Sequence, residues 1–192
     1  MKMLLICLAT VLLFSCNGEK IKSTEASVAT ITTTERENKK DIQLCKINGE
    51  DWQYTTASGI IFTEKKSTVK KALFTFKKKI DKGSEVVQVE YNLENNTLIR
   101  VLVNIKRSNT EGNKISAHYA ATEHSAATNK NIVLSGTIAI SDSNTASGTA
   151  NFKVDNRYEK TTLKHSEDLL IHVSNLHFSG VGYSDIDNTF GY

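Results

Sequence analysis

Apolar and polar residues alternate through most of the chain from residue 42 onward, with the period of two that is typical of β-strands. Gly, Asn, Asp and Ser residues, which favour turns, separate the alternating runs. These runs show no helical period of 3.6, and Glu123–Asn131 alone fits one short turn of helix. We therefore predict an all-β domain over residues 42–192, an antiparallel sandwich or barrel of about nine to ten strands joined mainly as hairpins.

One run differs from the others because both of its faces are apolar. Ile99–Ile105 places four apolar residues in one phase, and Leu98 and Leu102 lie in the other phase. A strand that is apolar on both faces is typically covered on both sides. This run is therefore predicted to be a central strand.

The first predicted hairpin turns at Asn48-Gly49, between the runs Ile42–Ile47 and Asp51–Tyr54. Both central residues of a two-residue hairpin turn need a positive φ, and Asn-Gly accepts it best. Trp52, the only tryptophan of the chain, is predicted to anchor the core.

Near the end of the chain the apolar residues change phase. Ile171 and Val173 share one phase, whereas Leu176 and Phe178 take the other. One extra residue in a strand produces such a change, so a bulge or kink is predicted near Ser174–Asn175.

The tetrapeptide Thr-Ala-Ser-Gly occurs twice, at Thr56–Gly59 and at Thr145–Gly148. Its residues are small and favour turns. We interpret both copies as turns that precede strands, and not as a sign of an internal repeat.

The first sixteen residues follow a different pattern. Lys2 precedes the uncharged run Met3–Phe14, and Ser15 and Cys16 follow it. This layout is typical of a secretory signal over residues 1–15, and the run is shorter than the about 20 residues of a membrane-spanning helix. Its ending, Leu13–Cys16, resembles the lipobox of bacterial lipoproteins, which implies lipidation of Cys16. The alternative is an ordinary signal peptide that is cleaved without lipid.

A lipid on Cys16 would attach the protein to a membrane. Each buried CH₂ group contributes about 0.8 kcal/mol, so one acyl chain such as palmitate binds marginally and two or more bind firmly. Asn17 follows the cysteine, in place of the Asp that retains enterobacterial lipoproteins at the inner membrane. We therefore expect a lipid-anchored protein of the cell envelope, held at the outer membrane.

Residues 17–41 are rich in Thr, Ser, Glu and Lys and contain no aromatic residue. Such a segment buries too little apolar surface to offset the entropy lost on ordering. We predict a flexible tether over residues 16–41, with a span of roughly 25–30 Å for about 25 residues. The alternative is a single helix or strand packed on the domain.

Charge and cysteine content argue against a nucleic-acid-binding protein and against a domain held together by internal disulfides. The formal net charge is +3, which gives no overall electrostatic reason to expect nucleic-acid binding. Cys7 lies in the signal and Cys16 at the lipid site, so Cys45 is left without an internal disulfide partner. Because Cys45 lies within an apolar strand, we predict a buried, unreactive thiol.

Lysines gather between residues 65 and 82. They could bind an anionic partner such as lipid headgroups, lipopolysaccharide or an acidic glycan. The alternative is that they keep hairpin ends soluble and protect edge strands from aggregation, which is the more frequent role of a charge run. The residues are Lys65, Lys66, Lys70, Lys71, Lys77, Lys78, Lys79 and Lys82.

Residues 166–192 carry acidic residues and no Lys or Arg. The acidic residues are Glu167, Asp168, Asp185 and Asp187. Asp185–Asn188 resembles the start of a calcium loop, but Phe190 stands where an EF-type loop needs Gly. None of the five histidines has zinc-ligand spacing, and His172 and His177 need not share a face because they flank the predicted bulge. We expect no metal, no cofactor and no catalytic residue.

Several of these features occur together in one known group of proteins. The lipobox-like ending, the polar tether, the opening Ile47–Trp52 and the late segment Ser147–Phe152 resemble small β-rich lipoproteins of the Bacteroidota. This resemblance implies attachment to the outer membrane, facing the periplasm or the cell surface. It implies no particular activity and no catalytic residue.

Three functions are compatible with this sequence. The first is a lipid-anchored, non-enzymatic domain that binds a protein or glycan partner, and the alternative is a lipocalin-like carrier of a small apolar ligand inside a barrel of eight or more strands. The third is a glycan hydrolase with two of the four carboxylates about 5–9.5 Å apart. We expect the first, because the sequence contains no catalytic motif.

Overall fold

The computed structural model describes residues 42–64, 67–81, 83–108, 114–155 and 170–187. The predicted signal, the lipid site Cys16 and the predicted tether lie outside the described residues. In the described part of the chain, no helix has the length and apolarity needed to cross a membrane.

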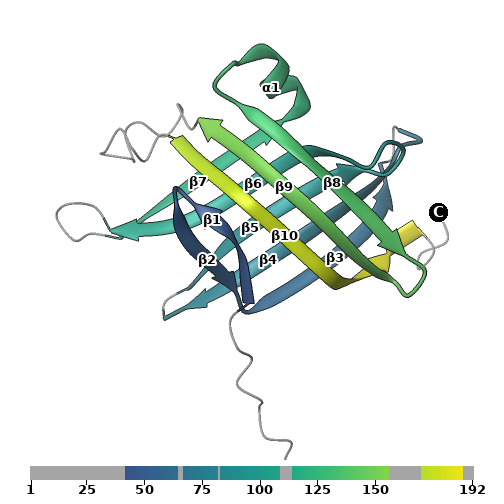
Figure 1. The fold of residues 1–192 in the computed structure, drawn as a ribbon, viewed down its shortest axis with the longest axis horizontal. Coiled ribbons are helices and arrows are strands. Elements are labelled where there is room, and N and C mark those ends of the chain that lie inside the picture. Colours follow the sequence, from purple (N-terminus) through teal and green to yellow (C-terminus); the bar gives the residue numbers. More distant parts are fainter. Residues whose placement is uncertain (1–41, 65–66, 82, 109–113, 156–169, 188–192) are drawn as a thin grey trace, which may run out of the picture. The chain divides into compact units, whose positions relative to one another are not determined.

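The described residues form ten strands and one short helix (Figure 1). The strands are β1 (Ile42–Ile47), β2 (Glu50–Tyr54), β3 (Thr56–Thr63), β4 (Lys70–Ile80), β5 (Gly83–Asn92), β6 (Thr97–Ser108), β7 (Lys114–Thr122), β8 (Val133–Ser141), β9 (Thr145–Asp155) and β10 (Leu170–Asp185). The helix is α1 (Glu123–Thr128), and the side chain of Thr122 caps it by accepting a hydrogen bond from the backbone N–H of Ser125. The all-β class, the strand number and the single short helix are as predicted.

Seven of the described strands close into a barrel, in the order β10-β3-β4-β5-β6-β8-β9 and back to β10. The remaining three strands extend it, since β1 pairs with β10, β2 pairs with β1, and β7 pairs with β6. In Figure 1, β8, β9 and β10 run across the direction of β4, β5 and β6. The barrel therefore consists of two crossing layers.

Two long strands join these layers. β10 pairs with β9 over most of its length, from Leu170 to Gly182, and with β1 in its first half. Its end pairs in parallel with β3 through Tyr183 and Gly59. β6 meets β8 at Thr97 and then pairs with β7 over most of its length. In barrels with crossing layers, strands that bend or bulge form the corners in this way. The parallel pair β3–β10 is the one exception to the predicted antiparallel pairing among the described strands.

The bulge predicted near Ser174–Asn175 is confirmed. The register between β9 and β10 shifts between Val173 and Leu176, and Asn175 has a φ of 54°. The extra residue keeps both the earlier and the later apolar side chains of β10 on the barrel interior. It also places His172 and His177 on the same, exposed face, a point that the sequence analysis left open.

The turn predicted at Asn48-Gly49 is also confirmed, with φ values of 50° and 88° and antiparallel pairing of β1 with β2. Trp52 is 4% exposed and belongs to the core, as predicted. The predicted central strand is β6, which has neighbours on both edges.

The interpretation of both Thr-Ala-Ser-Gly copies as turns is wrong. Thr56–Gly59 lies within β3 and Thr145–Gly148 lies within β9. A Cβ atom at Gly59 would come within 2.4 Å of the Phe74 ring, and one at Gly148 within 2.7 Å of the Phe178 ring. Each glycine therefore makes room for an aromatic ring inside the barrel.

Side chains fill the barrel interior. Phe178 lies among aromatic rings, with centroid distances of 5.0 Å to Phe74, 5.2 Å to Phe76 and 6.5 Å to Tyr91. The hydroxyl of Tyr91 donates a hydrogen bond of 3.0 Å to the backbone oxygen of Thr149. Rings at such distances pack favourably, so the core joins both layers through aromatic contacts.

Candidate functional site

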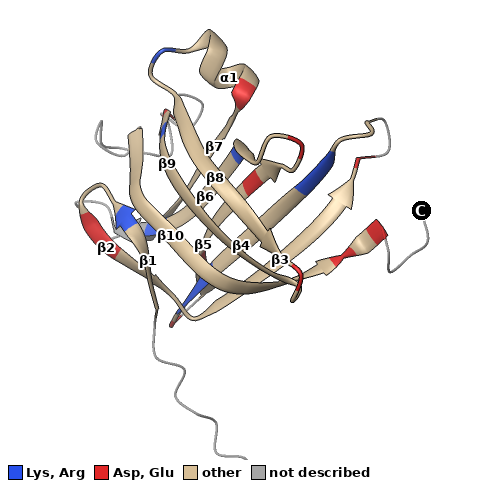
Figure 2. Cartoon of the chain, turned by 45° about the vertical axis from the view of Figure 1, so that its right-hand side comes forward, with Lys and Arg blue, Asp and Glu red and all other residues tan. Residues whose placement is uncertain are grey.

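The described lysines of the predicted cluster lie at the two ends of β4. Lys70 and Lys71 begin the strand, and Lys77, Lys78 and Lys79 come six or more residues later, about 20 Å or more away at about 3.4 Å per residue. The others of this cluster, Lys65, Lys66 and Lys82, lie outside the described residues. The five described lysines therefore form two separate groups (Figure 2).

The first group makes ion pairs. Lys70 contacts Asp185 at 2.7 Å, and Lys71 contacts Glu64 at 2.8 Å. The hydrogen bond between Lys71 and Glu64 raises the pKa of Lys71 and lowers that of Glu64. Lys71 also lies 3.6 Å from the buried Glu90, which contacts Arg100 at 2.5 Å. These lysines neutralise carboxylates on their own domain.

The described acidic residues of the predicted C-terminal group also make contacts within the domain. Asp187 accepts hydrogen bonds from the backbone N–H of Thr63 at 3.1 Å and from its hydroxyl at 2.6 Å. With the pair Lys70–Asp185, these contacts connect the end of β10 to β3 and β4. Glu167 and Asp168 lie outside the described residues. The described ranges contain no group of three or more His, Cys, Asp or Glu side chains placed to hold a metal ion.

Four of the five histidines are described, and each is exposed: His118, His124, His172 and His177. His165 lies outside the described residues. His172 and His177, which belong to β10, lie on the outer face of the barrel.

Cys45 is 2% exposed, and burial raises the pKa of its thiol from 9.0 to about 12. The nucleophilic form of cysteine is the thiolate. At neutral pH this thiol is therefore protonated and covered, which agrees with the predicted unreactive role.

This raised pKa predicts how stability depends on pH. We expect the free energy of unfolding to fall as the pH rises from about 9 towards 12, because the unfolded chain loses this proton more readily than the folded chain. One such group contributes a slope of at most about 1.4 kcal/mol per pH unit. Urea unfolding at about pH 8 and about pH 10.5 measures the loss. The Cys45→Ala variant should lose less over the same interval, and equal losses in both chains would contradict the assignment.

The outer face of β8, β9 and β10 carries no charge over most of its length. Lys, Arg, Asp and Glu are absent from Val133–Ser141, Thr145–Phe152 and Leu170–Ser184, and Figure 2 shows this face without charged colouring. We call this surface the uncharged face. Many of its exposed side chains are small and polar: Ser135, Thr137, Ser141, Thr149, Asn151, Asn175 and Ser179. The imidazoles of His172 and His177 and the apolar side chains of Val133 and Ile140 are also exposed there.

Hydroxyl and amide groups pair across the strands of the uncharged face. The hydroxyls of Thr137 and Thr149 lie 3.3 Å apart, and the hydroxyl of Ser147 donates to that of Ser179 at 3.2 Å. A hydroxyl can both donate and accept hydrogen bonds. These exposed groups therefore keep bonding capacity for a polar, uncharged ligand.

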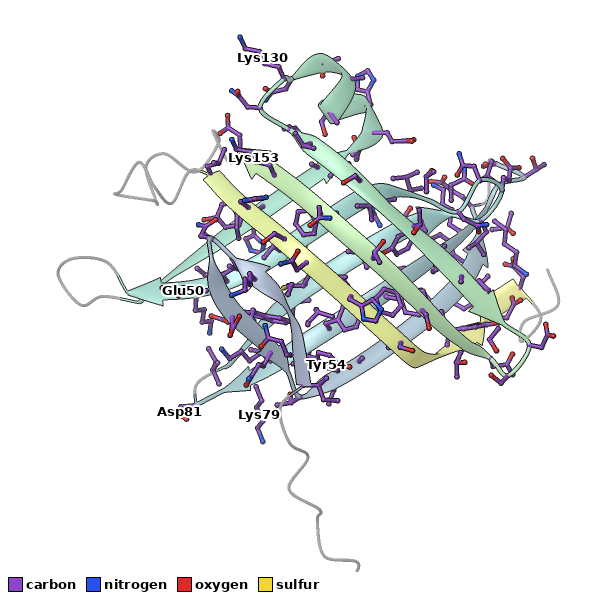
Figure 3. All side chains as sticks on the ribbon, viewed as in Figure 1. Glu50, Tyr54, Lys79, Asp81, Lys130 and Lys153 are labelled. Atoms are coloured by element: carbon purple, nitrogen blue, oxygen red, sulfur yellow. The ribbon has the colours of Figure 1, made fainter. Side chains whose placement is uncertain are left out.

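A second feature is a cavity of about 220 Å³ where the β1–β2 hairpin meets the ends of β4, β5 and β6. Ile47, Trp52 and Ile105 form its apolar wall. Its charged residues are Glu50, Asp51, Lys78, Glu85 and Lys106. We call it the mouth cavity. In Figure 3, Glu50 marks the hairpin side of this cavity at the left, and Lys79, lower down, marks the nearby end of β4. Lys130 and Lys153 lie away from it, towards the top of the barrel.

Glu85 is the buried charged residue of the mouth cavity, at 9% exposure. One carboxylate oxygen accepts a hydrogen bond of 3.1 Å from the indole N–H of Trp52, and the other accepts one of 3.2 Å from the backbone N–H of Lys106. Our sequence analysis did not single out Glu85. The sequence did contain a signal for it, because Glu85 is a charged residue in the same phase as the inward-facing Val87 and Val89.

Comparisons with known proteins give no relative: the chain matches no protein-family model, no curated protein and no solved structure.

Proposed function

We propose that this protein is a lipid-anchored, non-enzymatic protein of the cell envelope that binds a neutral glycan. The observation that carries this proposal is the uncharged face of β8, β9 and β10. It spans three paired strands and presents hydroxyl, amide and imidazole groups without Lys, Arg, Asp or Glu among them. A polyhydroxylated, uncharged chain matches this surface better than an acidic or basic partner does.

The composition of the uncharged face also favours a glycan over a protein partner. Protein interfaces are enriched in aromatic residues, Met and Arg near their centre. The exposed large apolar residues of β8, Val133 and Ile140, lie near the two ends of that strand. The middle of the face instead presents the side chains of Thr137 and Thr149, with His177 beside Thr149 in the β9–β10 register.

The N-terminal sequence supports the envelope location. The lipobox-like ending at Cys16 provides an anchor, and the polar segment that follows is long enough to hold a folded domain away from a membrane surface. A glycan-binding domain at such a place would contact envelope or extracellular polysaccharide.

The alternative function, a carrier of a small apolar ligand, gains support from the closure of the barrel. A ligand inside the barrel would, however, have to displace the ring of Phe178 and the aromatic side chains around it. Carrier barrels instead hold the ligand in open interior space. The filled interior therefore favours binding at the surface.

The glycan proposal predicts a charge-sensitive surface. We expect the purified protein to be retained on insoluble neutral polysaccharides, and Thr149→Lys to weaken retention about tenfold or more, because an unpaired ammonium group would stand in the centre of the face. Co-sedimentation with a panel of neutral and acidic polysaccharides measures this.

Thr56→Lys provides the matched control, since it makes the same change at an exposed position of β3. It should bind as the wild type does. Wild-type protein that sediments with no neutral polysaccharide, or an equal loss in both variants, would contradict the proposal.

A further inference from the structure

The mouth cavity contains charged side chains where the barrel pattern calls for apolar ones. On β4 the inward phase runs through Phe74 and Phe76 to Lys78, and on β5 it runs from Val87 back to Glu85. These charged residues lie directly opposite each other in the β4–β5 register. Placing charge on the inner face costs desolvation energy, so the arrangement calls for a compensating partner.

The two opposite charges do not compensate each other. Cross-strand neighbours have Cβ atoms about 4.5–5.5 Å apart, so a direct contact is within reach. Among the described residues, however, neither Lys78 nor Glu85 makes an ion pair. Glu85 instead receives two neutral N–H groups, and a carboxylate has acceptor sites for about four donors. Its remaining acceptor sites and the ammonium group of Lys78 are available to a bound molecule.

The volume of the mouth cavity limits the size of that molecule. Typical pockets for drug-sized ligands measure about 300–1,000 Å³, whereas a cavity of about 150 Å³ holds benzene. Benzene has six non-hydrogen atoms, so in proportion a cavity of 220 Å³ holds a ligand of about nine non-hydrogen atoms. The wall formed by Ile47, Trp52 and Ile105 suits a short apolar side chain.

We propose that the mouth cavity binds a small zwitterion, an α-amino acid with an apolar side chain. Its ammonium group binds Glu85, its carboxylate binds Lys78, and its side chain packs on the apolar wall. Such a ligand satisfies both inward-facing charges and adds no net charge to the site. This inference does not depend on the glycan proposal, since the uncharged face consists of other residues.

Trp52 offers a direct measurement, because it is the only tryptophan of the chain and lines the mouth cavity. The full-length chain in detergent is titrated with leucine, with isoamylamine, which lacks the carboxylate, and with 4-methylpentanoate, which lacks the ammonium group. Trp52 fluorescence and titration calorimetry report binding. We expect leucine to bind at least tenfold more tightly than either single-charge probe.

Three variants test the assigned contacts. We expect Glu85→Gln to weaken leucine and isoamylamine at least tenfold, and Lys78→Gln to weaken leucine and 4-methylpentanoate at least tenfold. Lys79→Gln, the matched control on the exposed face of the same strand, should leave all three affinities unchanged.

Two results would overturn the proposal. The first is the absence of any heat or fluorescence change with leucine up to about 10 mM in the wild-type chain, a result that does not depend on how well the variants fold. The second is leucine binding that all three variants retain while their melting temperatures show that they are folded.

Discussion

The Cys16→Ala chain is expected to leave the membrane fraction almost completely while its barrel melts at the wild-type temperature. Acyl chains on Cys16 would bind the membrane through about 0.8 kcal/mol for each buried CH₂ group, so their removal abolishes the anchor. The first described strand begins at Ile42, and distant sites without shared partners have additive effects within about 0.3–0.5 kcal/mol. Membrane fractionation and thermal melting of the released protein measure the two effects.

Two outcomes would contradict this expectation. A variant that stays membrane-bound after a high-salt wash would show that another part of the chain binds the membrane. The lysines at the end of β4, Lys77 and Lys79, would then be the first residues to replace, because they are exposed. A clearly lower melting temperature of the released protein would show that residue 16 contributes to the fold.

The second large effect is expected at the centre of the barrel. Phe178→Ala should lower the free energy of unfolding by about 3–5 kcal/mol, the usual cost of removing a buried Phe ring. For a domain of this size, each kcal/mol lowers the melting temperature by about 2–4 °C, so the shift should be about 6–20 °C. The effect is large because the ring is 2% exposed and contacts Phe74 and Phe76. Urea unfolding and thermal melting measure it.

Phe62→Ala is the matched control, because Phe62 lies on β3 but is only partly buried. This substitution should lower the free energy of unfolding clearly less than Phe178→Ala does. Equal losses in the two variants would show that the aromatic cluster does not hold the two layers of the barrel together.

Local features of the fold could be predicted from the sequence because burial in a strand repeats every two residues. The alternation around Val101 indicated a central strand, although its second face is only partly buried at Leu102, and the phase change between Val173 and Leu176 indicated the bulge. Asn48-Gly49 indicated its turn because few residue pairs accept two positive φ values. Each of these signals lies within a few residues of the feature that it predicts.

The closure of the barrel could not be predicted in this way. It depends on pairs such as Tyr183 with Gly59, whose residues lie far apart in the chain and show no common pattern. The two Thr-Ala-Ser-Gly copies were misinterpreted for a related reason. Whether Gly148 lies in a turn or under an aromatic ring depends on Phe178, a residue of another strand.

The candidate sites were missed for different reasons. Glu85 lies in phase with core residues, so a charged residue at an inward-facing position was the available signal for the mouth cavity. The hydrogen bond from Trp52 to Glu85 joins residues 33 positions apart in the sequence, a contact that periodicity does not show. The uncharged face could have been noticed in the sequence as three strand segments without Lys, Arg, Asp or Glu, but their adjacency requires the sheet order.

The parallel pairing of β10 with β3 has a consequence for how the protein folds. The hydrogen bond from Thr63 to Asp187 joins residues 124 positions apart, and β10 is the last of the described strands in chain order. A chain that is released from its N-terminus onward can form the hairpins of β3 to β6 early. It cannot close the barrel until β10 is available to pair with β3 and β9. Proteins dominated by such distant contacts fold slowly, over about milliseconds to seconds. Until folding is complete, they expose unpaired strand edges. The risk that this protein aggregates while it folds therefore depends on how long the edges of β3 and β9 stay unpaired.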